Sequence, residues 1–478
     1  MSSETTRLNE LFAYIESFVN LERGDKSTRV FRLDRMRALL DRTDHPERRR
    51  ATIHIAGSKG KGSVAIMAAS ILKELGFRTG VYLSPHVQDY RERFFIAGET
   101  VAIASYIDVL ARIRDLVETR IRPETPEAEL PTAFELLTLA GFLLFREEDC
   151  DWQVIETGLG GRLDATNVVI PDVTVLTPIE LEHTEYLGET IPEIAGEKAG
   201  IIKPGAPAIT GRQRPEALRV FEEKSASVGV PLFVADPRRL VASNPGGGYT
   251  FRLPIGELNV VPGMPGEHQA ENALLALTTI LSQIPDADPE ALRRGIEKAR
   301  LPGRFEVARL PGRFKSASEA PPVVLDGAHT PDSLKLFLEE LKRRYPDIDT
   351  LIFGPVAGKR YQELAPLVTD FASTVVLCSG LPKRPVDMPG LTKALREAEE
   401  ALGNRATEAV NPARTAASPD RRGSPEPLSI LQAQSVAQAV AWARNASGGR
   451  GFAVTGSFYL VGAVKEALSS DDLPSSGS

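Results

Sequence analysis

Short runs of apolar residues alternate with longer amphipathic segments over most of this chain. Residues 51–56 form an apolar run of strand length, and residues 64–75 repeat apolar positions with helical spacing. Such alternation is typical of a mostly parallel sheet covered by helices. The pattern therefore predicts an α/β fold. Further strands are expected at 81–83, 153–155 and 173–176, and a very apolar helix at 133–145.

The pattern changes between residues 234 and 261. Glycines at 246–248 and Pro254 separate short runs such as 249–253, which is typical of a few antiparallel strands. A strongly periodic helix is predicted at 269–281. We therefore expect small antiparallel strands beside the mostly parallel sheet.

After Arg304 the alternation of strands and helices starts again. This predicts a separate, Rossmann-like C-terminal α/β domain at 304–468, after an N-terminal domain at 1–303. Residues 403–427 are rich in Ala, Arg, Ser and Pro and are expected to form a flexible insertion, and 469–478 a disordered tail. Within the second domain we expect strands at 323–325, 350–353, 374–377 and 451–454 and a helix at 333–341.

The charge balance and the cysteines limit the possible classes of protein. Lys and Arg number 57 against 64 Asp and Glu, and no basic block exceeds residues 48–50, so a nucleic-acid partner is not expected. Cys150 and Cys378 are far apart, which fits a reducing compartment. No signal peptide and no apolar run of about 20 residues is evident. We expect a cytoplasmic protein without a membrane partner.

A glycine-rich segment, 57–63, follows the first predicted strand and opens a helix. Its glycines let backbone N–H groups converge on an anion, and Lys61 can reach the β- and γ-phosphates of a nucleotide. Gly62 separates Lys61 from Ser63, which departs from the usual phosphate-loop pattern. The alternative is a glycine-rich turn without a ligand. The candidate ATP contacts are Gly57, Lys59, Gly60, Lys61, Gly62 and Ser63.

Polar residues also follow other predicted strands, in segments 84–86, 156–167 and 182–188. Ligands in open parallel sheets gather at the carboxyl ends of strands, so Glu156 is placed to hold Mg²⁺ against a triphosphate. The alternative for Glu156 is a capping or ion-pairing carboxylate, and His183 could equally be a structural histidine. Lys198, taken alone, is uninformative.

Together these segments resemble the folylpolyglutamate synthase/dihydrofolate synthase family of the Mur ligase superfamily. The matches occur in family order and extend over roughly residues 10 to 465. The stretches at 158–167 and 183–205 are highly specific, whereas a phosphate loop alone would not be. The matching segments are 56–63, 84–86, 156–167, 183–205, 266–273, 301–306, 325–329 and 454–462.

The resemblance implies roles for individual residues. Lys198 matches the lysine that CO₂ carbamylates in these ligases, which would turn a cation into an anion that serves a second Mg²⁺. Catalytic roles are implied for Lys61, Lys198, His183 and His329. Further ATP contacts are implied for Asn272, Arg304 and Asp326, Mg²⁺ ligands for Ser84, Glu156 and His183, and pterin contacts for Thr132, Ala133, Phe134, Glu135, Leu163, Asp164 and Ala165.

The chain departs from the family pattern at a few positions. Ser58 and Lys59 stand where the family usually has Thr-Asn, and Glu182 stands where it usually has Asp. Thr330 replaces an Asn, which puts any contact by that side chain in doubt. None of these changes removes a group that the implied chemistry needs.

The resemblance implies an ATP-dependent ligase that adds L-glutamate to folates and to 7,8-dihydropteroate through an acyl phosphate. Its implied cofactors are ATP, two Mg²⁺ ions, the carbamate on Lys198 and a monovalent cation, and its implied state is a monomer. The second domain is expected to close over the nucleotide and exclude water.

Two other functions are considered. Another Mur-type amino-acid ligase would normally carry a separate N-terminal domain for a UDP sugar, and the segment before the phosphate loop is too short for one. A non-catalytic nucleotide-binding protein would not need Lys61, Glu156, His183 and Lys198 together.

Overall fold

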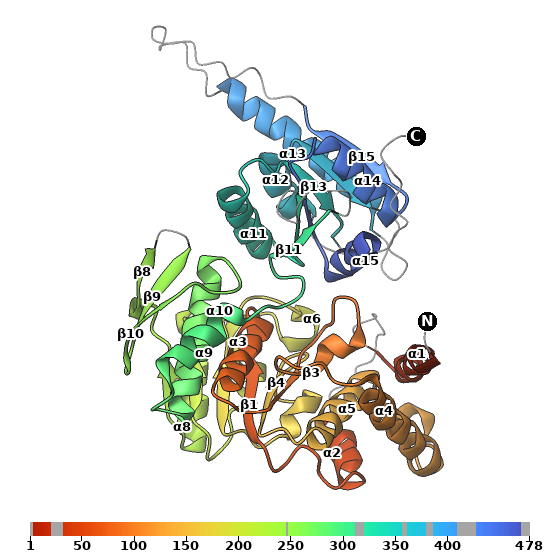
Figure 1. The fold of residues 1–478 in the computed structure, drawn as a ribbon, viewed down its shortest axis with the longest axis vertical. Coiled ribbons are helices and arrows are strands. Elements are labelled where there is room, and N and C mark those ends of the chain that lie inside the picture. Colours follow the sequence, from red (N-terminus) through yellow and green to blue (C-terminus); the bar gives the residue numbers. More distant parts are fainter. Residues whose placement is uncertain are drawn as a thin grey trace. The chain divides into compact units, whose positions relative to one another are not determined.

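The structure is a computed structural model that describes residues 3–20, 32–244, 247–310, 320–355, 361–378, 386–408 and 427–469, without the side chains of 242–244 and 403–408. The chain divides into two compact units, Met1–Leu301 (unit 1) and Pro302–Ser478 (unit 2). Each unit contains its own sheet (Figure 1).

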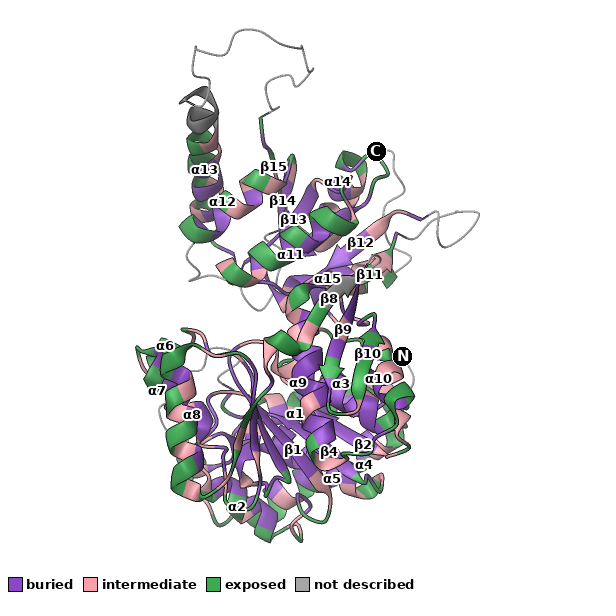
Figure 2. Ribbon diagram, turned by 90° about the vertical axis from the view of Figure 1, so that its left-hand side faces the viewer, coloured by how far each residue is buried: buried purple, intermediate pink, exposed green. Residues whose placement is uncertain are grey.

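In the described part of unit 1, seven strands form a sheet in the order β3-β2-β4-β1-β5-β6-β7. The pair β2–β3 is antiparallel and the other neighbouring pairs are parallel, as the alternating pattern predicts. The central strands β1, β4 and β5 are almost entirely buried, which explains why most of their residues are apolar (Figure 2). The strands are β1 (Ala51–Ala56), β2 (Thr79–Tyr82), β3 (Phe94–Ile96), β4 (Trp152–Glu156), β5 (Val173–Leu176), β6 (Ala208–Thr210) and β7 (Leu232–Val234).

Helices cover both faces of this sheet (Figure 1). One core joins Ile53 and Ile55 of β1 to α3 and α9, and a second joins Tyr82 and Ile155 to α1, α4 and α5. The predicted helices at 64–75, 133–145 and 269–281 are confirmed as α3, α5 and α9. The helices are α1 (Ser3–Glu16), α2 (Asp34–Asp41), α3 (Lys61–Glu74), α4 (Ile103–Leu116), α5 (Ala133–Glu147), α6 (Thr184–Leu187), α7 (Ile191–Ala199), α8 (Pro215–Val228), α9 (Glu267–Gln283) and α10 (Pro289–Lys298).

Unit 1 also contains the small antiparallel sheet that the change of pattern after residue 234 predicts. Its strands are β8 (Leu240–Asn244), β9 (Gly248–Leu253) and β10 (Gly256–Val260), in the order β10-β9-β8. Phe251 and Leu258 join the core that α9 shares with the large sheet. Burial of alternate residues on one face explains the mixed apolar and polar pattern of these strands.

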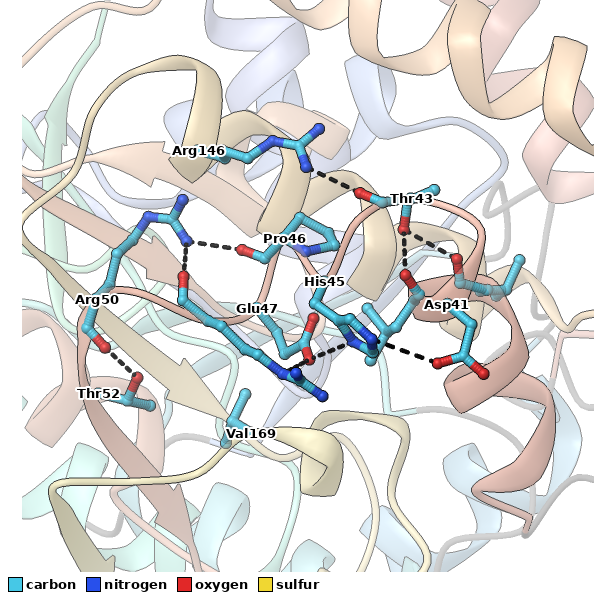
Figure 3. Close-up of polar contacts among 12 residues, drawn as sticks. Asp41, Thr43, His45, Pro46, Glu47, Arg50, Thr52, Arg146 and Val169 are labelled. Carbon is cyan, nitrogen blue, oxygen red and sulfur yellow. Dashed lines mark hydrogen bonds and ion pairs between the residues drawn. The ribbon is translucent and has the colours of Figure 1, made fainter.

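Polar contacts hold the connection between α2 and β1 (Figure 3). Arg146 of α5 donates to the carbonyl of Thr43 at 2.8 Å. Arg50 Nη1 donates to the carbonyl of Pro46 at 2.7 Å, and Thr52 Oγ1 donates to the carbonyl of Arg50 at 3.1 Å. These contacts fix the start of β1, whose other end leads into the glycine-rich segment.

Unit 2 has a sheet in the order β11-β12-β16-β13-β14-β15, in which only the β11–β12 pair is antiparallel within the described residues. The predicted strands at 323–325, 350–353, 374–377 and 451–454 are confirmed. The strands are β11 (Glu306–Arg309), β12 (Pro322–Leu325), β13 (Thr350–Phe353), β14 (Thr374–Cys378), β15 (Ser429–Ala433) and β16 (Phe452–Thr455), and the helices are α11 (Pro331–Arg344), α12 (Tyr361–Phe371), α13 (Met388–Glu408), α14 (Val436–Ala446) and α15 (Phe458–Ser469).

The start of the expected flexible insertion at 403–427 is wrong. Helix α13 extends to Glu408, so residues 403–408 are helical. They continue α13 from Leu402 although Gly403, Asn404 and Thr407 are weak helix formers, so the preceding helix extends into this segment. Residues 409–426 and 470–478, which carry most of the expected insertion and tail, lie outside the described residues.

Candidate active site

The glycine-rich segment forms a tight turn between β1 and α3. Gly57 and Gly60 have φ of 150° and 85°, a region that favours glycine. A Cβ atom at Gly57 would lie 1.9 Å from Thr177 Oγ1, and one at Gly60 would lie 2.4 Å from Asn272 Oδ1. Both glycines are therefore required by conformation and by space. The turn also brings Asn272 of α9, a predicted ATP contact, next to the loop.

Lys61, the first residue of α3, turns back over this loop. Its Nζ donates to the carbonyl of Gly57 at 3.1 Å and lies 4.0 Å from Glu156 Oε1. The amides of Ser58 and Lys59 donate to the carbonyl of Pro178 at 3.0 and 3.3 Å. The loop and its lysine are thus held in place. Ser63 is 3% exposed, which places its side chain inside the first turn of α3.

Glu156 lies beside this lysine because of the strand order. Glu156 ends β4, and in the parallel register it is opposite Ile55 of β1. Its Oε2 accepts a hydrogen bond of 3.1 Å from the amide of Ser84, which follows β2. A Cβ atom at Gly62 would lie 3.6 Å from the same oxygen. Three adjacent strands therefore bring Lys61, Ser84 and Glu156 together at one sheet edge.

Lys198, near the end of α7, reaches the same loop from another side. Its Nζ donates to the carbonyl of Gly57 at 2.9 Å and to Glu182 Oε1 at 3.0 Å, and its side chain is 2% exposed. Burial lowers the pKa of Lys198 to about 8, with the Lys61 charge adding to the effect and Glu182 opposing it. Two ammonium groups thus converge on the Gly57 carbonyl.

His183 lies near Glu182 and Lys198, at the start of α6, with φ of 47°. Burial lowers its pKa, and the positive charges of Lys198 and Lys61 act in the same direction. For Glu182, burial acts to raise the pKa, but the charges of Lys198 and Lys61 outweigh it and the net pKa is lowered. A neutral histidine and an ionised carboxylate are the forms that can bind a metal ion.

No group of three or more His, Cys, Asp or Glu side chains forms a preformed metal cage in the described parts of the chain. Glu156 and Ser84 do adjoin, and they offer one carboxylate and one hydroxyl. Mg²⁺ is commonly held by one or two carboxylates together with substrate phosphates and water. The residues present therefore fit Mg²⁺ that arrives with a nucleotide.

The loop after β4 is held by Asp164. Asp164 Oδ2 accepts hydrogen bonds from the amides of Gly158 and Leu159, both at 3.0 Å. The amide of Arg162 donates to the carbonyl of Glu197 at 2.8 Å, and Asn167 Nδ2 donates to the carbonyls of Arg162 and Gly200 at 3.0 and 3.2 Å. The loop is thereby tied to the end of α7, which carries Lys198.

The predicted pterin contacts at the start of α5 and in the loop after β4 differ in burial and in hydrogen bonding. Thr132 and Glu135 form a capping box, and Glu135 also pairs with buried Arg35 at 3.1 Å, so their polar groups are used inside the fold. Ala133 is buried. Phe134 is half-buried, and its ring occupies the space beside Gly158, where a Cβ atom would lie 2.5 Å from Phe134 Cζ. In the loop after β4, Leu163 is half-buried and Ala165 is buried.

Unit 2 brings Arg304, Asp326 and His329 together by itself. Asp326 accepts hydrogen bonds of 2.8 Å from the amides of Phe305 and Ala328, and burial raises its pKa against the opposing charge of Arg304. The Arg304 guanidinium carbon lies 4.4 Å from the ring centroid of Phe458.

His329 has a defined proton position. Its Nδ1 lies 2.8 Å from the carbonyl of Gly327, so Nδ1 carries the proton and donates. Its ring also makes an edge contact with Phe458, with centroids 6.4 Å apart. Phe458 therefore touches two of the predicted site residues in this unit.

Several residues at these sites were not predicted as functional. Phe458 and Arg35 act through packing and ion pairing with residues far away in the sequence. Glu182 lies in the polar segment 182–188 but was given no role, yet it is the ion-pair partner of Lys198. Its position next to His183 was a usable signal, as was the position of Phe458 in the family-matching segment 454–462, whereas Arg35 gave none.

Comparison with known families gives two matches. Residues 55–280 match the family described as Mur ligase middle domain, and residues 303–458 match the Mur ligase, glutamate ligase domain. Among curated proteins, the chain is 33% identical over 381 residues to the dihydrofolate synthase/folylpolyglutamate synthase of Bacillus subtilis (strain 168), covering 77% of this chain and 84% of that protein. It is 31% identical to the folylpolyglutamate synthase of Lacticaseibacillus casei, covering 96% and 98%.

Solved structures give the same result. Mycobacterium tuberculosis folylpolyglutamate synthase, in a study of its complexes with ADP and AMPPCP, aligns with a TM-score of 0.79 at 29% identity, covering 98% of this chain and 100% of that one. An FPGS–AMPPCP–folate complex aligns with a TM-score of 0.74 at 29% identity, covering 97% and 100%. Among the described helices of this chain, none has the length and apolar character of a membrane span.

Proposed function

Because this chain belongs to the folylpolyglutamate synthase/dihydrofolate synthase family of Mur ligases, we propose that it is an ATP-dependent ligase that joins L-glutamate to a folate-type carboxylate. The observation that carries this proposal is the grouping of Lys61, Glu156, Ser84 and Lys198 around one glycine turn. Such a grouping supports a phosphate site beside one carboxylate and one hydroxyl that can bind a metal ion, at the carboxyl ends of neighbouring strands.

The reaction needs activation because a carboxylate and an amine do not condense at neutral pH. The γ-phosphoryl group of ATP passes to the substrate carboxylate, which gives an acyl phosphate and ADP. The glutamate amine then attacks the acyl carbon, the C–O bond to phosphate breaks, and the amine loses a proton. Lys61 is placed to neutralise phosphate charge as the transfer proceeds.

We assign Ser84, Glu156 and His183 as the residues that would hold Mg²⁺, which would neutralise phosphate charge and orient the two reacting groups. Lys198 fits a carbamate because it is buried and its pKa is lowered to about 8, which makes the reactive neutral amine accessible. Carbamylation would also remove one of the two positive charges at the Gly57 carbonyl. From the family resemblance alone, we also propose that the protein binds a monovalent cation.

For the substrate, we propose pterin contacts for Phe134 and Leu163; their half-buried state supports this, while Thr132 and Glu135 make hydrogen bonds within the fold. The relatives are named for folate and for dihydrofolate synthesis, so both a folate and 7,8-dihydropteroate are candidate acids. Asn272, which lies beside the phosphate loop, is proposed to contact the nucleotide. From the family resemblance, nucleotide contacts are also proposed for Arg304, Asp326 and His329.

We also propose that the protein works as a cytoplasmic monomer on these small molecules. The net charge of −7 supports the absence of a nucleic-acid partner.

The test is an assay of ADP release with ATP and Mg²⁺. Glutamate is supplied or omitted, and dihydropteroate and tetrahydrofolate are offered in parallel. We expect glutamate-dependent ADP release with at least one acid, and loss of at least 100-fold in Lys61→Ala and Glu156→Ala, whose circular dichroism should match the parent. Glutamate-independent ADP release, or normal turnover in both variants, would refute the proposal.

A further inference from the structure

A chain of buried hydrogen bonds joins β1 to the loop after β4. His54 Nε2 lies 3.0 Å from Thr166 Oγ1, which lies 2.5 Å from Asp164 Oδ1. His54 and Thr166 are fully buried and Asp164 is 6% exposed. Burying polar side chains costs free energy unless they are hydrogen-bonded, and these two bonds satisfy three buried polar side chains at once.

The direction of each bond follows from the donors available. Burial raises the pKa of Asp164, but three backbone amides already donate to its carboxyl oxygens, so this group acts as an acceptor and the single Thr166 hydroxyl proton points to it. Thr166 Oγ1 must then accept from His54, which places the imidazole proton on Nε2. His54 Nδ1 has no hydrogen-bond partner among the described residues, and burial lowers the pKa of His54 well below its usual value, so the ring is neutral. The donors thus all point toward Asp164.

Asp164 connects the hydrogen bonds of His54 and Thr166 to the backbone of the loop after β4. Its Oδ1 also accepts from the amide of Thr166 at 3.0 Å, and its Oδ2 accepts from the amides of Gly158 and Leu159. The amides of Gly158 and Leu159 lie two and three residues after Glu156, the last residue of β4. The other part of the loop is tied separately to α7 through Asn167. The hydrogen bonds that start at His54 in β1 therefore fix the part of the loop around Gly158 and Leu159.

We propose that His54 and Thr166 are positioning residues for the pteroyl substrate, because they orient Asp164 so that it holds the turn at 158–165. This turn carries half-buried Leu163, and it packs on Phe134 at Gly158. The inference rests on the proposed function, because it assigns the turn to the pterin rather than to the nucleotide.

The first test compares Thr166→Val, which keeps the shape and removes the hydroxyl, with Thr166→Ser, which keeps the hydroxyl. We expect Thr166→Val to raise KM for the pteroyl substrate about tenfold while KM for ATP stays within twofold. Thr166→Ser should stay within about threefold for both. Likewise, the His54→Gln variant, which retains an N–H donor, should bind the pteroyl substrate more tightly than the His54→Met variant.

Amide hydrogen exchange provides a readout that does not need activity. Thr166→Val should speed exchange at Gly158 and Leu159 at least tenfold, while the amides of β5 stay unchanged. If the parent chain shows no glutamate-dependent turnover, the proposed function fails and the exchange result still tests the network. A valine variant with unchanged exchange, with equal losses for ATP and the pteroyl substrate, or with the same defect as the serine variant overturns the inference.

Discussion

At the scale of single residues, the site depends on charges placed in a buried environment. Lys61 and Lys198 both donate to the carbonyl of Gly57, and Glu182 is the carboxylate that pairs with Lys198. Repulsion between ammonium groups and loss of water both favour the neutral form of a buried lysine. Lys198 is therefore suited to react with CO₂ near neutral pH.

This gives a prediction for pH. With a pKa of about 8, about half of the Lys198 side chains are neutral at pH 8 and about 3% at pH 6.5. Since only the neutral amine reacts with CO₂, enzyme depleted of CO₂ should regain activity after addition of bicarbonate faster at pH 8 than at pH 6.5, at equal dissolved CO₂. The initial rate of recovery of ADP release measures this. A recovery rate independent of pH would contradict it.

A second residue-scale prediction concerns Phe458. Its ring lies against the Arg304 guanidinium, a contact worth about 1 kcal/mol, or about fivefold in binding. Phe458→Leu should therefore raise KM for ATP about fivefold at saturating glutamate and folate, whereas Phe458→Tyr keeps the ring and should stay within twofold. Equal KM values for the leucine and tyrosine variants would show that the ring does not act through Arg304.

At the scale of elements, α5 shows how a sequence pattern can have a structural cause. Thr132 and Glu135 cap the helix, and Glu135 neutralises Arg35 of α2, whose side chain is 8% exposed. The family resemblance placed both residues at the pterin. These contacts stay a prediction, and in the structure the two side chains cap the helix start and hold α2 against α5.

The prediction is a loss of stability without a loss of substrate affinity. Thr132→Ala removes one cap and should lower the free energy of unfolding by about 1 kcal/mol. Glu135→Gln leaves Arg35 buried without its counter-charge and should cost about 3 kcal/mol. Urea unfolding measures both effects. KM for the pteroyl substrate should remain within twofold, and a rise of tenfold at unchanged stability would return these residues to the binding site.

At the scale of the whole molecule, the chain has two compact units with separate sheets. The phosphate loop and its lysines belong to unit 1. Calorimetry should therefore show that AMPPCP with Mg²⁺ raises the unfolding temperature of unit 1 by a few °C, since a ligand at 100 times its Kd stabilises by about 2.7 kcal/mol. Lys61→Ala should abolish this shift. A parent chain without a shift would contradict nucleotide binding at the loop.

Much of the architecture follows from local pattern. The apolar runs predict β1, β4 and β5 because strands buried on both faces are mostly apolar, and the glycines of the phosphate loop mark a turn that other residues rarely adopt. β15 was missed because it has a mixed pattern of exposed and buried positions. The beginning of the insertion was placed too early because α13 continues through Gly403 and Asn404, two residues of low helix propensity at which a helix end is expected.

The sequence by itself determined the alternating α/β fold, the glycine turn with Lys61, and the family to which the motifs belong. Only the tertiary structure decided that Glu182 pairs with Lys198, that Asp164 serves its own loop, and that His54 reaches Thr166. The physical reason is the distance along the sequence over which each property is determined. Backbone conformation and hydrophobic period are local properties of the chain, whereas the partner of a buried charge or donor depends on which distant segments the sheet order brings within hydrogen-bond distance.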